Sequence, residues 1–322
     1  MPRLTCRYST EPAERLLQSE RVLAVVDFSA AGQVELGARY INPGLPLLSP
    51  EPWREVWRCD APVVSGLEGG CHWSHSDAVL LLARRIEEGR GQDLGAAVRD
   101  AYGLLLGQAR ARGFPHVLRI WNYFAHINQG EGDGERYKRF CVGRAQAFEA
   151  AGYAEAHYPA ASAIGHGGGD GVIYLLAAQV PPRHFENPQQ VSAYRYPRCY
   201  GPRSPSFARA TLLESRGGAE LFLSGTASVV GHRTLHPGDP AGQLGVTLAN
   251  IEGLLQHVAA RAALPAPPRL TGVKAYLREP EAAAGLRRGL RAHFGDQVPL
   301  VLLRGDICRR DLAIELEGVG ER

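Results

Sequence analysis

The order of apolar segments after residue 190 constrains the fold more than any other feature of the sequence. Three strand-like patterns come first, followed by a long amphipathic helix pattern, a strand, a second helix and two closing strands. This order predicts a mixed α+β layer in which two helices cover one face of a sheet. Gly295 follows the second helix at the position where a left-handed residue commonly ends a helix. The predicted strands are 192–197, 209–214, 220–231, 270–278, 298–305 and 311–320, and the predicted helices are 244–264 and 281–295.

The first half of the chain repeats this rhythm less clearly. Two β-rich runs within 20–41 flank a glycine and predict a hairpin. Residues 46–58, rich in proline and tryptophan, are predicted to form an ordered loop. A helix at 93–112, a strand at 116–124 and a helix at 135–151 follow. We therefore expect two related domains, of which the first has diverged.

A glycine-rich segment, 161–171, precedes one further strand pattern. It lacks both the GK[ST] ending of a phosphate loop and the GxGxxG spacing, so we interpret it as the connector of a hairpin. Three prolines within 181–190 mark the best candidate for a domain boundary. The sequence thus predicts an N-terminal domain at 1–180 and a C-terminal domain at 181–322.

Composition narrows the classes of function. Hydrophobic residues make up 45% and charged residues 21% of the chain, as in a globular enzyme. The net charge of +3, without a cluster of basic and aromatic residues, gives no indication of nucleic acid binding. No apolar run reaches the length of a membrane helix, and the N-terminus lacks the pattern of a signal peptide. We therefore expect a cytoplasmic protein without a membrane partner.

The cysteines and histidines give no indication of a metal site. The six cysteines contain no CxxC pair, which in a reducing compartment predicts free thiols. The eleven histidines form no H-x-D/E…H arrangement of the kind that a non-haem iron centre requires.

Four segments of the second half carry a first resemblance, to the small trimeric imine and enamine deaminases called YjgF-like. They are ELFLSGTASVVGH (220–232), QLGVTLANIEGLL (243–255), VKAYLRE (273–279) and IELEG (314–318). The similarity covers about residues 219–319 and implies a YjgF-like (RidA-like) α/β domain, with a divergent copy before it.

A more specific resemblance spans nearly the whole chain. It rests on RIWNYFAHIN (119–128) with GEGDGERYKRFCVGRAQAF (130–148), YPAASAIG (158–165), YGPRSPSFARAT (200–211) and GDICRRDLAIELEG (305–318). These blocks are similar to those of chorismatases of the 3-hydroxybenzoate synthase type. The resemblance implies chorismate as a small-molecule substrate, release of pyruvate, a catalytic C-terminal domain and neither metal nor organic cofactor.

Arginines are the expected ligands of a substrate with two carboxylates, because the planar guanidinium donates in pairs. A lone arginine more often forms a surface ion pair, but here the candidates are concentrated in two blocks. Tyr137 and Arg144 are seven residues apart, and therefore lie on one face of the predicted helix. Arg203 stands between two prolines that fix its backbone. The full set of predicted substrate-binding side chains is Tyr137, Arg144, Tyr200, Arg203, Arg209 and Arg309.

Glu315 is the candidate general acid. Strand alternation places it on one face with Glu317, which would also suit the polar face of an edge strand. The resemblance aligns Glu315 with the catalytic glutamate of the family, and burial would raise its pKa as a general acid requires. Cys308 falls where the resemblance implies the aromatising branch, which forms 3-hydroxybenzoate through an arene oxide. Arg309 and Arg310 beside it would favour a thiolate, whereas a lone cysteine is usually a small buried apolar side chain.

The SGT segment supplies three further candidates, Gly225, Thr226 and Ala227. Gly225 allows close approach of the backbone to the substrate, and Ala227 beside Cys308 leaves room for 4-hydroxybenzoate as a second product. Three alternatives stay open. They are a chorismate hydrolase that forms a dihydroxycyclohexadienoate, an imine deaminase that uses Arg304 or Arg309, and a binding module without chemistry. The sequence leaves both a monomer and a trimer open, and does not assign the product to a pathway of secondary metabolism.

Overall fold

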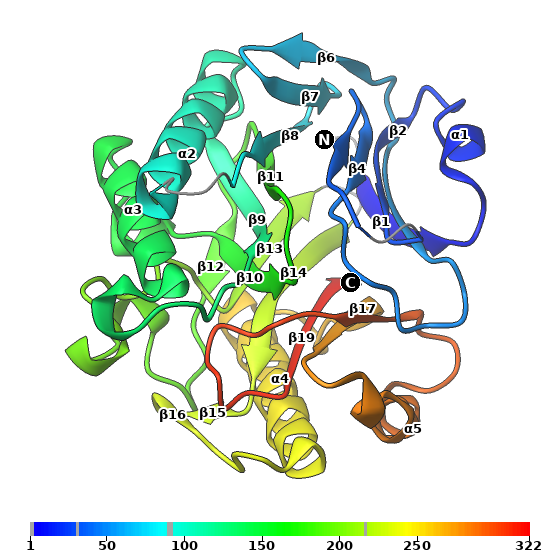
Figure 1. Ribbon diagram of the computed structural model, residues 1–322. Coiled ribbons are helices and arrows are strands. Elements are labelled where there is room, and N and C mark those ends of the chain that lie inside the picture. The colour runs from blue at the N-terminus through cyan, green and yellow to red at the C-terminus, as the bar shows by residue number, and fades with distance from the viewer. Residues whose placement is uncertain (1–2, 30–31, 89–92, 216–217) are drawn as a thin grey trace.

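The first sixty residues form a five-stranded sheet in a computed structural model that describes residues 3–29, 32–88, 93–215 and 218–322 (Figure 1). The strand order is β1-β5-β2-β4-β3. All side chains of β2 are buried, as expected for a strand covered on both faces. The elements are β1 (Leu4–Ser9), α1 (Ala13–Leu16), β2 (Val22–Asp27), β3 (Glu35–Leu36), β4 (Tyr40–Asn42) and β5 (Arg54–Cys59).

Two predictions for this region are wrong. Residues 20–41 do not form one hairpin of two β-rich runs, because β2 and β4 pair in parallel, and parallel neighbours require a crossover. The antiparallel pair in this region is the short one between β3 and β4, on either side of Gly37. The end of the predicted loop 46–58 is the strand β5, which lies antiparallel to both β1 and β2.

The second sheet has six strands in the order β10-β9-β11-β8-β7-β6. Helices α2 and α3 cover its outer face, on the left of Figure 1. Its elements are β6 (Val64–Glu68), β7 (Cys71–His75), β8 (Val79–Ile86), α2 (Leu94–Ala111), β9 (His116–Ala125), α3 (Arg136–Ala150), β10 (Ala160–His166) and β11 (Gly171–Ala178).

The third sheet also has six strands, in the order β12-β13-β14-β19-β17-β18. Helices α4 and α5 pack on its outer face, at the bottom of Figure 1. Its elements are β12 (Arg183–Phe185), β13 (Ala210–Ser215), β14 (Gly218–Ala227), α4 (Pro240–Ala262), β17 (Arg269–Leu277), α5 (Ala283–Phe294), β18 (Leu300–Arg304) and β19 (Ile314–Glu321), with a small ribbon of β15 (Val229–Val230) and β16 (Arg233–Thr234).

The second and third sheets have the same topology, which confirms the prediction of an α+β fold built from two related halves. Each has three antiparallel strands, a helix, a strand, a second helix and a parallel edge strand; a last strand then inserts between the third and fourth. We call residues 64–178 the first repeat and residues 183–321 the second repeat. The division of the chain into domains 1–180 and 181–322 stays a prediction, and the sheet of β1–β5 belongs to neither repeat.

This topology corrects two further sequence interpretations. The segment 161–171 is not a hairpin connector, because β9 lies between β10 and β11, and β10 itself occupies 160–166. Residues 192–197 are not a strand; they contain a short 3₁₀ turn within the long connection from β12 to β13. The first strand of the second repeat, β12, instead lies inside the predicted boundary segment 181–190.

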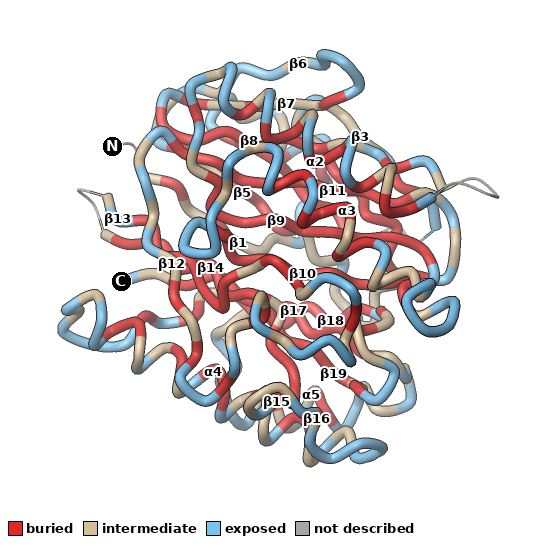
Figure 2. The backbone as a smooth tube through the Cα atoms, turned by 90° about the vertical axis from the view of Figure 1, so that its left-hand side faces the viewer, coloured by how far each residue is buried: buried red, intermediate tan, exposed pale blue. Residues whose placement is uncertain are grey.

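The three sheets turn their inner faces toward one apolar core. Trp57 of β5 packs against Trp121 of β9 and Phe222 of β14, with ring centroids 5.8 and 6.0 Å apart, so each sheet contributes one of the three rings. Figure 2 shows the buried backbone concentrated in these strands, with exposed segments at the periphery. The five-stranded sheet thus closes a core that the two repeats would leave open.

Local signals explain where the long helices begin and end. Asp93 and Asp239 precede α2 and α4, and their carboxylates each accept a hydrogen bond of 3.0 Å from a backbone N–H in the first turn. Pro240 occupies the first turn of α4, where a missing N–H costs nothing. Gly295 ends α5 with a φ of 77°, as the sequence predicts. Within the described residues, every helix is too short or too polar to cross a membrane.

Candidate active site

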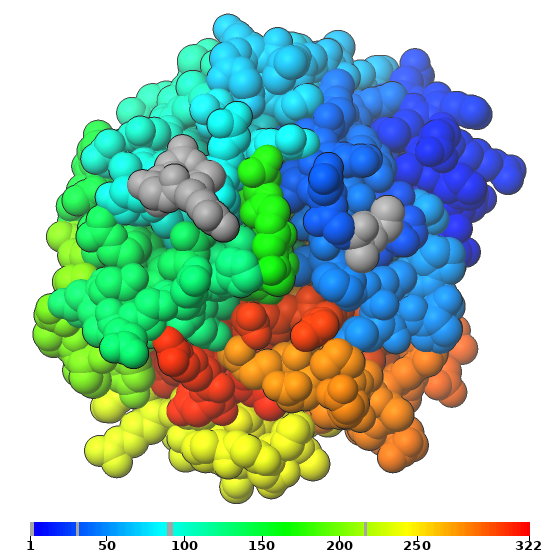
Figure 3. Space-filling view, in the orientation of Figure 1, coloured from blue at the N-terminus to red at the C-terminus, as the bar shows by residue number. Residues whose placement is uncertain are grey.

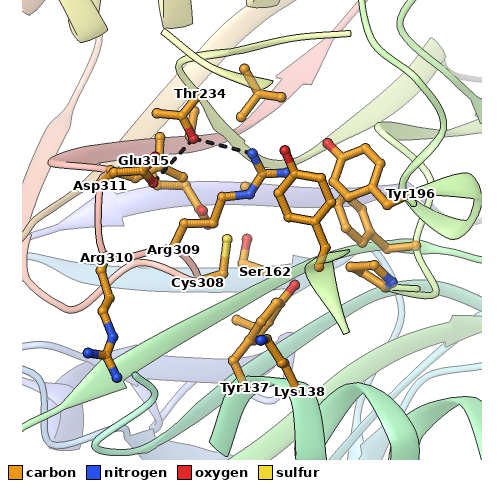
Figure 4. Close-up of a pocket in the computed structure, with 18 of the residues that line it drawn as sticks. Tyr137, Lys138, Ser162, Tyr196, Thr234, Cys308, Arg309, Arg310, Asp311 and Glu315 are labelled. Carbon is orange, nitrogen blue, oxygen red and sulfur yellow. Dashed lines mark hydrogen bonds between the residues drawn. The ribbon is translucent and has the colours of Figure 1, made fainter. Parts of the chain in front are cut away.

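A pocket with a volume of about 340 Å³ opens where the two repeats meet. The first repeat contributes α3 and β10, and the second contributes β14, β19, the connection before β13 and the loop before β19 (Figure 4). The repeats are joined beside this pocket by a hydrogen bond of 3.0 Å from Ala161 N–H to Ser224 Oγ. The volume suits a small ligand.

Glu315 lies on β19 with its carboxyl group at the pocket wall, and only 5% of the residue is exposed. Burial raises its pKa to about 8, and the charge of Glu317 acts in the same direction. Gly225 leaves room for it, because a Cβ there would lie 2.0 Å from Glu315 Oε1. Strand β14 has an irregular register between Leu223 and Thr226, and this bulge sets Gly225 against the carboxyl group. The site therefore holds a carboxylic acid that is protonated at neutral pH.

Glu317, two residues further on the same face of β19, has the opposite environment. Lys274 Nζ and Arg119 Nη2 lie 2.6 and 2.7 Å from its carboxylate oxygens. Trp121 donates an indole hydrogen bond of 2.9 Å, and the hydroxyl of Ser162 donates another. Although burial raises the pKa of Glu317, the charges of Lys274 and Arg119 outweigh it and lower that pKa to about 2. A permanent negative charge thus stands behind the protonated Glu315.

A second buried carboxylate completes this charged cluster beneath the pocket. Lys274 Nζ also lies 2.8 Å from Glu55 on β5, so the ammonium group joins the first sheet to the second repeat. Both Lys274 and Glu55 are almost fully buried. Buried ions of this kind are tolerated only when they are paired.

Two guanidinium groups in the pocket have donors without partners among the described residues. Arg144 on α3 is 1% exposed, and neither Nε nor Nη2 has a hydrogen-bond acceptor in the described part of the chain. Its guanidinium lies 4.7 Å from the centre of the Phe140 ring. Arg209 donates to the carbonyl of Val191 and the hydroxyl of Tyr196, and its buried Nε finds no acceptor among the described residues. Buried unpaired donors of fixed charge are suited to carboxylates of a ligand.

The aromatic wall opposite Cys308 is held by Arg309. Its guanidinium stacks 4.1 Å from the ring centre of Tyr200 and 5.1 Å from that of Tyr196. The same group donates to Thr234 Oγ1 at 3.2 Å, and Thr234 in turn bonds to Asp311 (Figure 4). These contacts hold the guanidinium group of Arg309 at the pocket wall.

Cys308 lines the pocket close to Glu315, but its thiol is not activated. Burial raises the pKa of Cys308 to about 12, and the charge of Glu315 adds to this, outweighing the lowering effect of Arg309. Arg310 turns its guanidinium away to the carbonyls of Asn128 and Gly130. Of the two alternatives that the sequence leaves open for Cys308, burial favours the small neutral thiol over the thiolate.

The structure gathers most of the predicted residues around one cavity. Arg203 is not among them: its side chain is 43% exposed and pairs with Glu149 on the surface, because the loop between the prolines turns outward. Thr226 is buried but outside the lining, and its hydroxyl donates to the carbonyl of Ser224. The predicted residues that line the cavity are Tyr137, Arg144, Tyr200, Arg209, Gly225, Ala227, Cys308, Arg309 and Glu315.

Sequence reasoning missed several lining residues. Ser162 lies in β10 within a run of small residues, where nothing distinguishes it from core positions. Tyr196 was assigned to a strand, although three tyrosines within 194–200 indicated an aromatic surface. Lys138 follows Tyr137 directly, and Phe207 precedes Arg209 by two residues. Both lie inside sequence blocks that carry predicted site residues, and this proximity is the signal that could have identified them.

No group of three or more histidine, cysteine or acidic side chains in the described ranges is placed to hold a metal ion.

Comparison with known proteins extends these observations. Residues 55–177 match a family model described as chorismatase FkbO/Hyg5-like, N-terminal. A chorismatase of Streptomyces hygroscopicus is 37% identical over 98% of this chain and 93% of its own length, and a 3-hydroxybenzoate synthase of that organism is 38% identical over 92% and 91%. A chorismatase crystal structure at 1.08 Å resolution superimposes with a TM-score of 0.89 and 34% identity, covering 99% of this chain and 98% of the other.

The fold and the pocket define an α+β enzyme with an enclosed site for a small molecule. The identity and coverage of these relatives are high enough to establish the protein family. The chain belongs to the chorismatase family.

Proposed function

We propose that this enzyme converts chorismate into pyruvate and 3-hydroxybenzoate, with 4-hydroxybenzoate as a second product of the same ring chemistry. The observation that carries the proposal is the pairing of a buried, protonated Glu315 with two guanidinium groups that have free donors in one pocket. The names of the two curated relatives support the choice of substrate and product.

The charges of the pocket suit a dianion. Six cationic side chains line it against three carboxyl groups, one of which is the protonated Glu315. Chorismate carries one carboxylate on its ring and one on its enolpyruvyl group. We assign these to Arg144 and Arg209, whose free donors would otherwise be left buried and unpaired. The cationic lining residues are Lys138, Arg144, Arg209, Arg233, Arg309 and Arg310.

Glu315 supplies the proton in this proposal. It protonates the methylene carbon of the enolpyruvyl group, which activates the ether for departure. The ring hydroxyl attacks the neighbouring carbon, expels pyruvate and returns its proton to the Glu315 carboxylate. The arene oxide so formed opens to the phenol with a hydride shift. The atoms of chorismate are thereby divided between pyruvate and a hydroxybenzoate, and no water is consumed.

The neutral thiol of Cys308 directs the opening of the arene oxide. An S–H group is a weak donor that can lie against the epoxide oxygen without attacking the ring, whereas a thiolate would be a nucleophile. The raised pKa of Cys308, which keeps the thiol neutral, therefore suits this role. Ala227, which packs in the same apolar cluster as Cys308, limits the space on that side of the ring.

The direct test incubates the purified protein with chorismate and resolves the products by chromatography beside a pyruvate assay. We expect equal amounts of pyruvate and hydroxybenzoate, and a decrease in kcat of about 100-fold or more for Glu315→Gln, as for loss of a general acid. Glu321→Gln, at the half-buried end of the same strand and away from the pocket, is the matched control. A non-aromatic diol in place of hydroxybenzoate would indicate a hydrolase, and an absence of pyruvate would refute the proposal.

A further inference from the structure

The loop that carries Cys308 is held by contacts outside the pocket. It joins β18 to β19 and covers residues 305–313. In Figure 3, atoms from this end of the chain, in red, lie on the surface between green segments of the first repeat and the yellow and orange segments of the second. Such a loop has no sheet partner along most of its length, so side chains must fix its path.

Arg278, directly after β17, uses its whole guanidinium for this purpose. Nε donates to the carbonyl of Leu312 at 2.9 Å, and Nη2 donates to the carbonyls of Ile307 and Arg309 at 3.1 and 2.9 Å. Nη1 bonds to Asp306 Oδ1 at 2.6 Å. Arg278 therefore binds the peptide group that precedes Cys308, through the Ile307 carbonyl, and the peptide group that follows Arg309.

Asn128 of the first repeat extends the clamp. Its side-chain oxygen accepts a hydrogen bond of 3.1 Å from Arg278 Nη1, and its amide nitrogen donates to the carbonyl of Cys308 at 3.3 Å. The carbonyls of residues 307, 308 and 309 are therefore all bound by these two side chains. Arg278 and Asn128 are both outside the lining of the active-site pocket.

We propose that Arg278, with Asn128, is a positioning residue that sets the place of the Cys308 thiol and thereby the choice of product. This inference rests on the proposed function for its effect on products, but the clamp itself can be tested without turnover. Because three successive carbonyls are fixed, the Cα–Cβ bond of Cys308 points in one direction. The thiol is then held at one position relative to the ring of the bound substrate. Without the clamp the loop can rotate, and the ring intermediate loses its fixed neighbour.

The test compares Arg278→Lys with Arg291→Lys. Lysine keeps the positive charge beside Asp306 but cannot donate in a planar fork to three carbonyls. Arg291 is the matched control, because its guanidinium also binds three loop carbonyls, those of Gly295, Asp296 and Val298, but in the loop before β18 and not in the one that carries Cys308.

We expect Arg278→Lys to reduce the ratio of 3-hydroxybenzoate to all other products by about fivefold or more, a change of about 1 kcal/mol in relative barriers. The KM for chorismate should change by less than about twofold, because the carboxylate-binding arginines are untouched. Arg291→Lys should leave both the product ratio and the KM at the wild-type values. An unchanged product ratio in Arg278→Lys overturns the role in product choice.

A second measurement follows the thiol itself. Alkylation of Cys308 by iodoacetamide is quantified by peptide mass spectrometry, with the exposed Cys199 as the internal reference. Arg278→Lys and Asn128→Ala should each accelerate alkylation of Cys308 relative to Cys199 by several fold. If Arg278→Lys does not fold, Asn128→Ala decides both measurements. Unchanged alkylation of Cys308 in these variants refutes the clamp. If the wild-type protein forms no hydroxybenzoate, the proposed function is refuted, but the alkylation rates still decide whether the clamp exists.

Discussion

A methyl group added at Gly225 should displace the carboxyl group of Glu315, the proposed general acid, while leaving the strand intact. The new Cβ would lie 2.0 Å from Glu315 Oε1 and 2.7 Å from its carboxyl carbon, whereas ordinary van der Waals contact begins at 3.4 Å. The carboxyl oxygen must therefore retreat by about 1.4 Å. The backbone of Gly225 is not in the left-handed region that favours glycine, so alanine brings no strain of its own.

A displacement of this size has a known order of effect. Misplacing a catalytic group by about 1 Å costs roughly 100-fold in rate, so we expect kcat of Gly225→Ala to fall by about that factor. The KM should change little, because Arg144 and Arg209 keep their positions. Steady-state kinetics by pyruvate release measures both quantities, and thermal unfolding checks that the variant is folded.

Gly245→Ala is the matched control for this substitution. Gly245 lies within α4, where an added Cβ meets no atom within 4 Å. Alanine there should stabilise the protein by about 0.5–1 kcal/mol and leave kcat unchanged. If Gly225→Ala retains full kcat while folded, the position of the Glu315 carboxyl group does not govern the reaction, and the reasoning fails.

Three other predictions follow from the charges. Because the acid form of Glu315 persists up to its pKa of about 8, kcat should be level below pH 8 and decrease as pH rises through that value; a profile that falls on the acid side would contradict a general acid. Arg144→Ala should lower kcat/KM about 10- to 100-fold through loss of a charged hydrogen bond to the substrate. Arg203→Ala should change kcat/KM less than about twofold, because it removes one exposed ion pair. Equal effects of the two substitutions would refute the assignment of Arg144 as a carboxylate ligand. Lys274→Met should lower the free energy of unfolding, measured in urea, by about 3–5 kcal/mol, because Glu55 and Glu317 lose their shared ammonium group, although Arg119 remains beside Glu317. A change below about 1 kcal/mol would mean that these carboxylates become neutral at little cost.

The sequence predicted most of the second repeat because its signals are local. The helix at 244–264 and the strands at 270–278 and 298–305 follow from apolar spacing, which the structure confirms as α4, β17 and β18. Pairing is a different matter. Nothing in the sequence of 161–171 indicates that β9 lies between β10 and β11 in the sheet, because strand order is decided by contacts between distant segments.

The site was predictable where it rests on motif residues and not where it rests on loop direction. Glu315 was recognisable from strand alternation together with the resemblance, but alternation suited a solvent-exposed polar face equally well, and its burial is known only from the structure. The two prolines on either side of Arg203 restrict its backbone, but they do not indicate whether its side chain points into the pocket or to the surface. For Cys308 the sequence left a thiolate and a small buried thiol both open, and burial, with the guanidinium of Arg310 bound elsewhere, favours the thiol. Desolvation depends on packing that adjacent residues in the sequence do not reveal.

The covalent linkage of the two repeats has a consequence for how such a pocket changes over evolutionary time. In an assembly of identical subunits, every substitution appears on both sides of a shared interface at once. Here Ser162 and Arg144 belong to one repeat and Gly225 and Glu315 to the other, so each wall is encoded once and mutates alone. Each wall can therefore change without an obligatory change in the other, which is impossible for the identical subunits of a symmetric oligomer.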